Sequence, residues 1–164
     1  MAQALRLRPP RNQVDRRAIG WWAVTAVIEV AVPLVICLVL ALVIEPARRW
    51  LLLVAAVLAV LGLGYALVMP VWRFRVHRWE ATDEAVYTRS GWLFQEWRIA
   101  PLSRIQTVDT ARGPLEQLFR LASVTVTTAS AAGPLHIHGL DHRLAADLAH
   151  RLTETTQATP GDAT

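Results

Sequence analysis

The first half of the chain contains two long apolar runs separated by a short polar break. Residues 21–44, "WWAVTAVIEVAVPLVICLVLALVI", and residues 50–72, "WLLLVAAVLAVLGLGYALVMPVW", are each long enough as helices to cross the hydrocarbon core of a bilayer. Tryptophans stand at the ends of both runs, where indole rings prefer the headgroup level of a membrane. The pattern predicts an antiparallel transmembrane hairpin over residues 21–72.

After residue 72 the apolar residues come in short runs that are typical of strands. The segments "AVYT", "WLFQEWRIA", "RIQTVDTA", "SVTVTTA" and "PLHIHGL" are rich in β-branched and aromatic residues or alternate polar with apolar ones. The segment "FRVHRWEAT" at residues 74–82 also favours a strand, and "TRSGW" predicts a tight turn at Ser90 and Gly91. Six or seven strands are expected in this half.

The period of the pattern changes again near the end of the chain. Residues 142–155 place leucines four positions apart, which predicts an amphipathic helix, and Asp141 is a suitable N-cap. We expect this helix to cover the open end of the sheet. Residues 156–164 contain no apolar anchor and are expected to form a disordered tail.

A shorter helical segment is expected inside the strand region. The stretch "GPLEQLFRL" at residues 113–121 fits a single helical turn between two strands, with Leu115, Leu118 and Phe119 packing beneath the sheet. The pattern of residues 73–155 therefore predicts a mainly-β barrel or sheet that is capped by a C-terminal helix.

Composition and charge support a membrane protein. The chain has 164 residues, of which 54% are hydrophobic, and carries a net charge of +4. Its arginines gather beside the two apolar runs: Arg6, Arg8, Arg11, Arg16 and Arg17 precede the first, Arg48 and Arg49 separate them, and Arg73, Arg75 and Arg78 follow the second. The positive-inside rule then predicts a two-pass protein of the bacterial plasma (inner) membrane, with both termini in the cytoplasm and residues 1–20 as a basic cytoplasmic segment.

The same arginines indicate the partners of the chain. Arg16, Arg17, Arg73, Arg75 and Arg78 are expected to lie close to membrane lipid. Because the remaining arginines are dispersed among acidic residues, the chain has no basic stripe, and a nucleic-acid partner is not expected.

Glu29 is an acidic residue inside the first apolar run. A carboxylate at this depth is costly unless it is protonated, paired or turned toward protein. One interpretation makes the protein a small subunit of a transport or channel complex that uses Glu29, but neither run offers a second charged residue for a relay, so a contact between helices is favoured. Gly62 and Gly64 in the second run permit close helix approach.

Catalytic chemistry is not indicated by the sequence. It contains no phosphate-binding loop, nucleophile elbow or zinc-protease motif, so no catalytic residue, no cofactor and no enzymatic activity are expected. His136 and His138 project from one face of a strand and are weak candidates for a metal, but a zinc site needs more ligands than these two. No metal site is therefore predicted.

A family resemblance completes the sequence-based picture. The segments "RSGWLFQEWRIAPLSRIQTV", "GPLEQLFRLASV", "TTAS" and "IHGL", preceded by paired spans, resemble the bacterial pleckstrin-homology-like (PH-like) domain of YdbS-type membrane proteins over residues 15–155. Many relatives carry Gly where this chain has Arg120. The resemblance implies a protein-interaction or assembly module at the cytoplasmic face of the membrane, whose partner is a larger membrane protein with related domains or a second copy. An anionic-lipid-sensing module is the alternative binding role.

Overall fold

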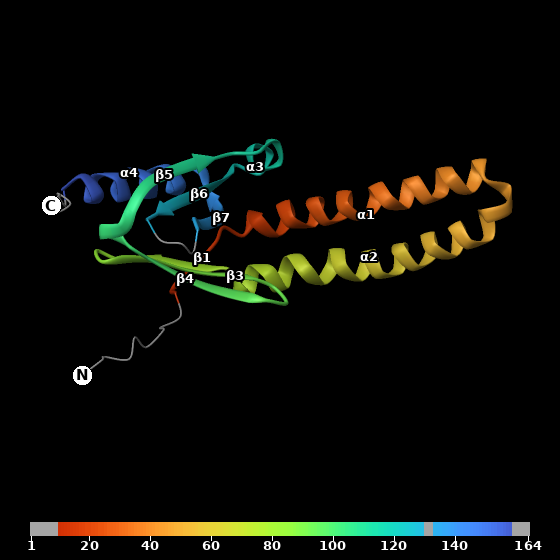
Figure 1. The fold of residues 1–164 in the computed structure, drawn as a ribbon, viewed down its shortest axis with the longest axis horizontal. Helices are drawn as coiled ribbons and strands as arrows, with labels where there is room; N and C mark the ends of the chain where they lie inside the picture. The colour runs from red at the N-terminus through yellow and green to blue at the C-terminus, as the bar shows by residue number, and fades with distance from the viewer. Residues whose placement is uncertain (1–9, 130–132, 159–164) are drawn as a thin grey trace. The chain divides into compact units, whose positions relative to one another are not determined.

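The computed structural model describes residues 10–129 and 133–158, which divide into two compact units (Figure 1). One unit holds residues 19–72 and is helical. The other unit combines the N-terminal residues up to Ala18 with the chain from Arg73 onward, and it contains all seven strands of the described residues.

The helical unit is built from the two apolar runs. Helix α1 spans Arg17–Val43 and helix α2 spans Arg48–Val76, and the 3-10 turn η1 at Glu45–Ala47 joins them. Both helices are long and apolar enough to cross a membrane, so the prediction of two membrane-length N-terminal helices is confirmed.

Helix α2 continues past its tryptophan into residues that the alternation had assigned to a strand. Phe74 to Val76 are helical, and the backbone N–H of His77 still donates to the carbonyl of Arg73 at 2.9 Å. The prediction of a strand beginning at residue 74 is therefore wrong. Extending an existing helix by one turn adds one hydrogen bond per residue without a new nucleation cost, which outweighs a weak local alternation.

The two helices approach closely at one of the two glycines. A Cβ atom on Gly62 would overlap the Val30 side chain of α1 and would lie 2.9 Å from its Cγ2, whereas no atom lies within 4 Å of a Cβ on Gly64. Tyr65 Oη also donates a hydrogen bond of 3.2 Å to Glu29 Oε2. Glu29 thus has a partner on the neighbouring helix, as the helix-contact interpretation requires.

The mainly-β unit consists of two antiparallel sheets and not of a closed barrel. The first sheet has the order β1 (Asn12–Gln13), β2 (Arg78–Ala81), β3 (Ala85–Gly91) and β4 (Gln95–Pro101). The second has the order β5 (Ile105–Ala111), β6 (Leu121–Thr128) and β7 (Leu135–Asp141). The barrel alternative is therefore wrong and the sheet alternative is confirmed.

The break between the sheets lies in the stretch "PLSR". The 3-10 turn η2 at Leu102–Arg104 follows β4, and the buried Leu102 donates its backbone N–H to the carbonyl of Glu84. Because this turn redirects the chain, β4 and β5 do not pair, and the sheet cannot close on itself. The N-terminal strand β1, which the sequence pattern did not indicate, adds to the first sheet by pairing with β2.

The β3–β4 hairpin reverses later than predicted. Strand β3 runs through Ser90 and Gly91, and residues 92–94 form the connection. Gly91 has a φ of +103°, and a Cβ at this position would collide with the carbonyl oxygen of Phe94. A left-handed glycine at the end of the strand is compatible with this longer connection, so the turn moves beyond Ser90.

Helix α4 (His142–Ala158) packs on the three-stranded sheet and buries Ala145, Leu148 and Leu152. It extends to Ala158, so the expected disordered tail is wrong for residues 156–158. Residues 159–164, like the arginines at positions 6 and 8, lie outside the described residues.

Asp141 caps helix α4 as predicted. Its Oδ1 accepts a hydrogen bond of 2.9 Å from the backbone N–H of Arg143. Burial raises the pKa of Asp141, but the backbone N–H groups of Arg143 and Leu144, together with His142 and Arg17, outweigh burial and hold the pKa below its ordinary value.

The short helix α3 (Pro114–Leu118) forms where it was expected but buries different residues. Leu118 is 74% exposed and does not pack beneath the sheet, whereas Glu116 is buried. Both oxygens of Glu116 are bound, one by the backbone N–H of Gly113 at 2.7 Å and one by the hydroxyl of Ser123 at 2.5 Å. These hydrogen bonds, which no apolar pattern reveals, orient the helix with Glu116 toward the sheet.

Arg120 has a φ of 55° at the end of α3, a conformation that favours glycine. We expect Arg120→Gly to stabilise the folded chain by roughly 1 kcal/mol, because the left-handed backbone conformation disfavours a Cβ atom. Thermal unfolding of the full chain in detergent micelles measures this gain. Arg120→Ala is the control: it removes the charge but keeps the Cβ, so an equal gain in both variants would contradict the explanation.

Candidate functional site

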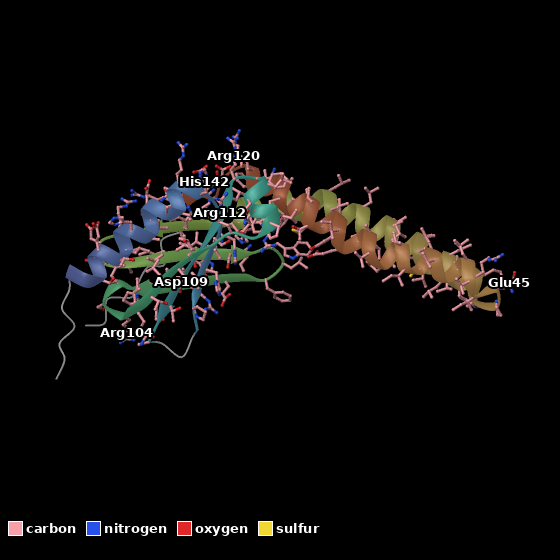
Figure 2. All side chains as sticks on the ribbon, turned by 90° about the horizontal axis from the view of Figure 1, so that it is seen from above. Glu45, Arg104, Asp109, Arg112, Arg120 and His142 are labelled. Atoms are coloured by element: carbon pink, nitrogen blue, oxygen red, sulfur yellow. The ribbon has the colours of Figure 1, made fainter. Side chains whose placement is uncertain are left out.

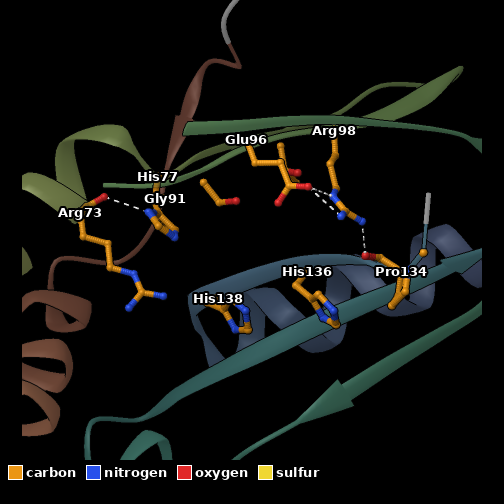
Figure 3. A pocket seen from close by; sticks show the side chains of 11 residues that line it. Arg73, His77, Gly91, Glu96, Arg98, Pro134, His136 and His138 are labelled. Carbon is orange, nitrogen blue, oxygen red and sulfur yellow. Dashed lines mark hydrogen bonds and ion pairs between the residues drawn. The ribbon is translucent and has the colours of Figure 1, made fainter. Parts of the chain in front are cut away.

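A polar cavity of about 400 Å³ lies between the two sheets of the mainly-β unit (Figure 3). The last turn of α2 contributes Arg73 and the residue that follows the helix is His77, while strand β7 contributes His136 and His138. The β3–β4 hairpin provides the opposite wall with Thr88, Ser90, Gly91, Glu96 and Arg98.

Strand register explains why these side chains meet. In β7, Leu135 and Ile137 point into the apolar core, so the alternating His136 and His138 point to the other face. Across the cavity, Thr88 pairs with Arg98 and Ser90 pairs with Glu96. Directly opposed residues of an antiparallel pair share one face of the sheet, so the hairpin presents one continuous polar surface.

His138 belongs to a chain of hydrogen bonds. The hydroxyl of Ser123 donates to Glu116 Oε1 at 2.5 Å. The Oγ atom of Ser123 also lies 3.0 Å from His138 Nδ1. Because the hydroxyl hydrogen is used by the carboxylate, Nδ1 of His138 is the donor to Ser123, and Nε2 of the neutral ring is an acceptor. His136 stacks on His138 with ring centroids 5.6 Å apart, and its Nδ1 lies 3.1 Å from the hydroxyl of Thr125.

His77 is buried at the helix end of the cavity, with 4% of its surface exposed. Its Nδ1 lies 3.0 Å from the carbonyl of Arg73, which can only accept, so Nδ1 is protonated. Burial lowers the pKa of His77 to about 4, with further lowering by the charge of Arg73. Burial also lowers the pKa of His138, as do Arg73 and His136, while Glu116 opposes the shift. Both rings are therefore neutral at pH 7.

Two arginines and one carboxylate provide the fixed charges of the cavity. Arg98 forms an ion pair of 2.7 Å with Glu96 and donates to the carbonyl of Pro134 at 2.8 Å. Arg73 enters from the other end, and Figure 3 shows its guanidinium near the rings of His77 and His138. Among the described residues no group of three or more His, Cys, Asp or Glu side chains is arranged to hold a metal ion.

The residues singled out from the sequence are dispersed by the structure. Arg73, His136 and His138 meet in the cavity. The others lie elsewhere: Arg16 and Arg75 are exposed, Arg17 forms ion pairs with Asp15 and Asp141, Arg78 lies on β2, and Glu29 lies in the helical unit.

Sequence reasoning missed the roles of His77, Ser123 and Glu116. His77 was placed on a strand, so its position one helical turn after Arg73 was not recognised. A spacing of four residues between an arginine and a histidine at the end of an apolar helix was the available signal. Ser123 and Glu116 carried no signal, because their hydrogen bonds depend on the orientation of α3.

Comparisons with known proteins agree with the fold. A family model described as "Bacterial PH domain" matches residues 23–156. The chain is 30% identical over 125 residues to a protein of Bacillus subtilis (strain 168) named "UPF0699 transmembrane protein YdbS", and the match covers 74% of this chain and 78% of that protein. Neither name describes an enzyme. No solved structure matches the chain significantly.

Proposed function

The chain belongs to the bacterial PH domain family, and we propose that it is a non-catalytic protein-interaction module anchored at the cytoplasmic face of the plasma membrane. Its partner is a membrane protein with related PH-like domains or a second copy of the chain. The distribution of charge supports this orientation. Arg16, Arg17, Arg73 and Arg75 flank the outer ends of the two helices, and fewer basic residues lie in the connection between them.

The observation that favours a protein partner is the open edge of strand β5. This strand is the end of its sheet, and no strand of the described residues pairs with its outer side. Five of its seven residues are exposed. An unpaired edge presents backbone N–H and C=O groups to any strand that can align with it.

The chemistry of β5 suits a partner strand. From Thr107 onward its pairing with β6 is regular, so its backbone is extended for addition of another strand. Figure 2 shows Arg104 and Arg112 beyond the two ends of the strand and Asp109 between them. A second copy of the chain presents the same edge, so pairing of the two β5 edges would satisfy the backbone groups of both. The exposed apolar residues Leu93 and Phe94 offer an additional contact on the β3–β4 connection.

Site-specific crosslinking tests this function. We expect a photo-crosslinking residue in place of Asp109 on β5 to capture, in native membranes, a second copy of the chain or another protein with a PH-like domain. The edge of β5 would then lie against the partner. The matched control is the same residue in place of Glu154, which is exposed on α4.

Two results would reject the proposal. One is the absence of any crosslink from position 109 above the level at position 154. The other is capture only of proteins without a related domain.

A further inference from the structure

We propose that two copies of the chain associate within the membrane through the side of helix α1 that carries Glu29. In this pair the carboxyl groups of the two Glu29 side chains meet and form hydrogen bonds with each other. The contact is separate from the β5 edge, because residues 19–72 form a compact unit of their own. It adds a second surface to the interaction module and does not depend on the first.

Glu29 is exposed on the surface of the helical unit, inside a segment that is long and apolar enough to cross a membrane. It follows Trp21 by eight residues, which corresponds to about 12 Å along the helix axis. Since the tryptophan marks the headgroup level, the side chain of Glu29 lies at the depth of the hydrocarbon. Carboxyl groups at this depth are costly, and they pair with one another or face the interior of a helix bundle. The exposed side of Glu29 therefore requires a protein partner.

The chain itself satisfies only one of the two carboxyl oxygens. Tyr65 Oη donates to Oε2 of Glu29 at 3.2 Å, and within the described part of the chain no residue donates to Oε1. Apart from Glu29, neither apolar run contains a charged residue, so no arginine of the spans can neutralise the group. The partner of Oε1 must come from another molecule.

A second copy of the chain supplies the matching group at the right depth. Two copies that insert in the same direction form a closed pair about a twofold axis along the membrane normal, so equivalent residues lie at the same depth. A neutral carboxyl group carries one O–H donor and can also accept, which makes it complementary to itself. The O–H group at Oε1 of each copy donates to Oε2 of the other, and Oε2 retains a lone pair for Tyr65. Two ionised groups would repel each other, so the neutral form is the one that pairs.

The residues around Glu29 have the spacing of a helix–helix contact. Positions at alternating intervals of four and three residues lie on one side of α1, like the seam of a coiled coil: Thr25, Glu29, Val32, Ile36, Val39 and Val43. The last four are between 51% and 73% exposed. The contact with α2 uses another side of α1, which includes Val30 and the buried Ala26.

Glu29 selects this seam from the other exposed sides of α1. Val27 and Leu38 are also apolar and exposed, so hydrophobicity alone does not decide which side meets a second helix. A single polar residue in an apolar seam does decide, because its hydrogen bonds form only when that residue faces its partner. The same requirement fixes the register of the two copies.

Disulfide crosslinking in membranes tests which side of α1 meets the second copy. Cys37→Ser first removes the one cysteine of the chain, and Ile36→Cys or Leu38→Cys then introduces a new one. Both positions are exposed and lie at nearly the same depth, but Ile36 shares the side of Glu29, whereas Leu38 is about 200° further around the helix. We expect oxidation with copper phenanthroline to link two copies through Ile36→Cys, with a yield roughly fivefold that of Leu38→Cys.

Replacement of Glu29 in the chain with Cys37→Ser and Ile36→Cys tests the carboxyl pair. Glu29→Gln should keep the crosslink, because an amide group both donates and accepts and so pairs with its equivalent. Glu29→Leu should lower the yield roughly fivefold, since leucine cannot replace these hydrogen bonds. Glu45→Leu is the matched control: it removes the carboxylate of η1, whose side chain is 83% exposed, and should leave the yield unchanged.

A yield with Ile36→Cys no higher than that with Leu38→Cys would overturn the proposal, and this comparison decides even if Glu29→Leu does not insert. An unchanged yield in Glu29→Leu would also overturn it, as would an equal loss in Glu29→Gln and Glu29→Leu, or disulfides that join the chain only to a different protein. Photo-crosslinking from position 109 is a separate experiment, so failure of this contact is distinguishable from failure of the β5 edge.

Discussion

Gly62→Leu is expected to destabilise the packing of α1 against α2, whereas Gly64→Leu is expected to have little effect. The first atom of a side chain on Gly62 would already overlap Val30, while the corresponding atom on Gly64 has no neighbour within 4 Å. Val30 cannot yield easily, because a β-branched side chain in a helix has one strongly preferred rotamer. Forcing extra atoms into such a contact typically costs about 1–3 kcal/mol.

Unfolding of the full chain by increasing sodium dodecyl sulfate in mixed micelles, followed by loss of helical circular dichroism, measures this cost. Gly64→Leu is a close control, since it places the same residue in the same helix two positions away. Equal destabilisation by both substitutions would show that the Val30 contact does not determine the packing of the two helices. Close packing against Val30 would then not be the reason for a glycine at position 62.

Acidification from pH 7 to pH 4.5 is expected to destabilise the mainly-β unit through its buried histidines. The pKa of His77 is about 4 in the folded chain, against an ordinary value of 6.5. Between these values the unfolded chain binds a proton that the folded chain does not, so stability is highest above pH 6.5 and falls as the pH decreases toward 4. His138 acts in the same direction, because its pKa is also lowered. The loss attributable to His77 alone is at most about 3 kcal/mol.

The measurement is the melting temperature of the full chain in micelles as a function of pH, in a buffer without phosphate or sulfate. His77→Asn should flatten the pH dependence, because it removes the titrating group while its amide can still donate to the carbonyl of Arg73. His150→Asn is the control, since it makes the same replacement at a histidine that is exposed on α4 and not buried. A dependence that persists in full in His77→Asn would exclude His77 as its source.

The helical half of the chain could be predicted almost completely from local pattern. Two long apolar runs, of which the first is interrupted only by Glu29, with a five-residue break leave few alternatives to a helical hairpin, since backbone polar groups in a bilayer must be satisfied within the segment. What the pattern could not locate was the end of α2. Residues 74–76 can continue a helix or begin a strand, and the hydrogen bonds of the preceding turns decide between these alternatives.

The candidate site could be predicted only in part. His136 and His138 were visible as a pair because alternate residues of a strand share a face, and Arg73 was visible because it follows an apolar run. Their meeting with His77 was not predictable, because it depends on contacts between segments that are about 60 residues apart in the chain. The metal interpretation of His136 and His138 considered their strand alone. In the folded chain Arg73 and Arg98 line the same cavity as the two histidines.

The pattern of apolar and polar residues along the chain was sufficient to determine the two apolar helices, most of the strands and the amphipathic helix that covers the second sheet. The length of an apolar run and the spacing of apolar side chains select the local backbone conformation. Only the tertiary structure decided that the strands form two open sheets, that β1 joins the first of them, and that Arg73 and three histidines share one cavity. The physical reason is that these features depend on which distant segments pair and pack together. That choice follows from the balance of burial and hydrogen bonding over the whole domain, which no short window of sequence contains.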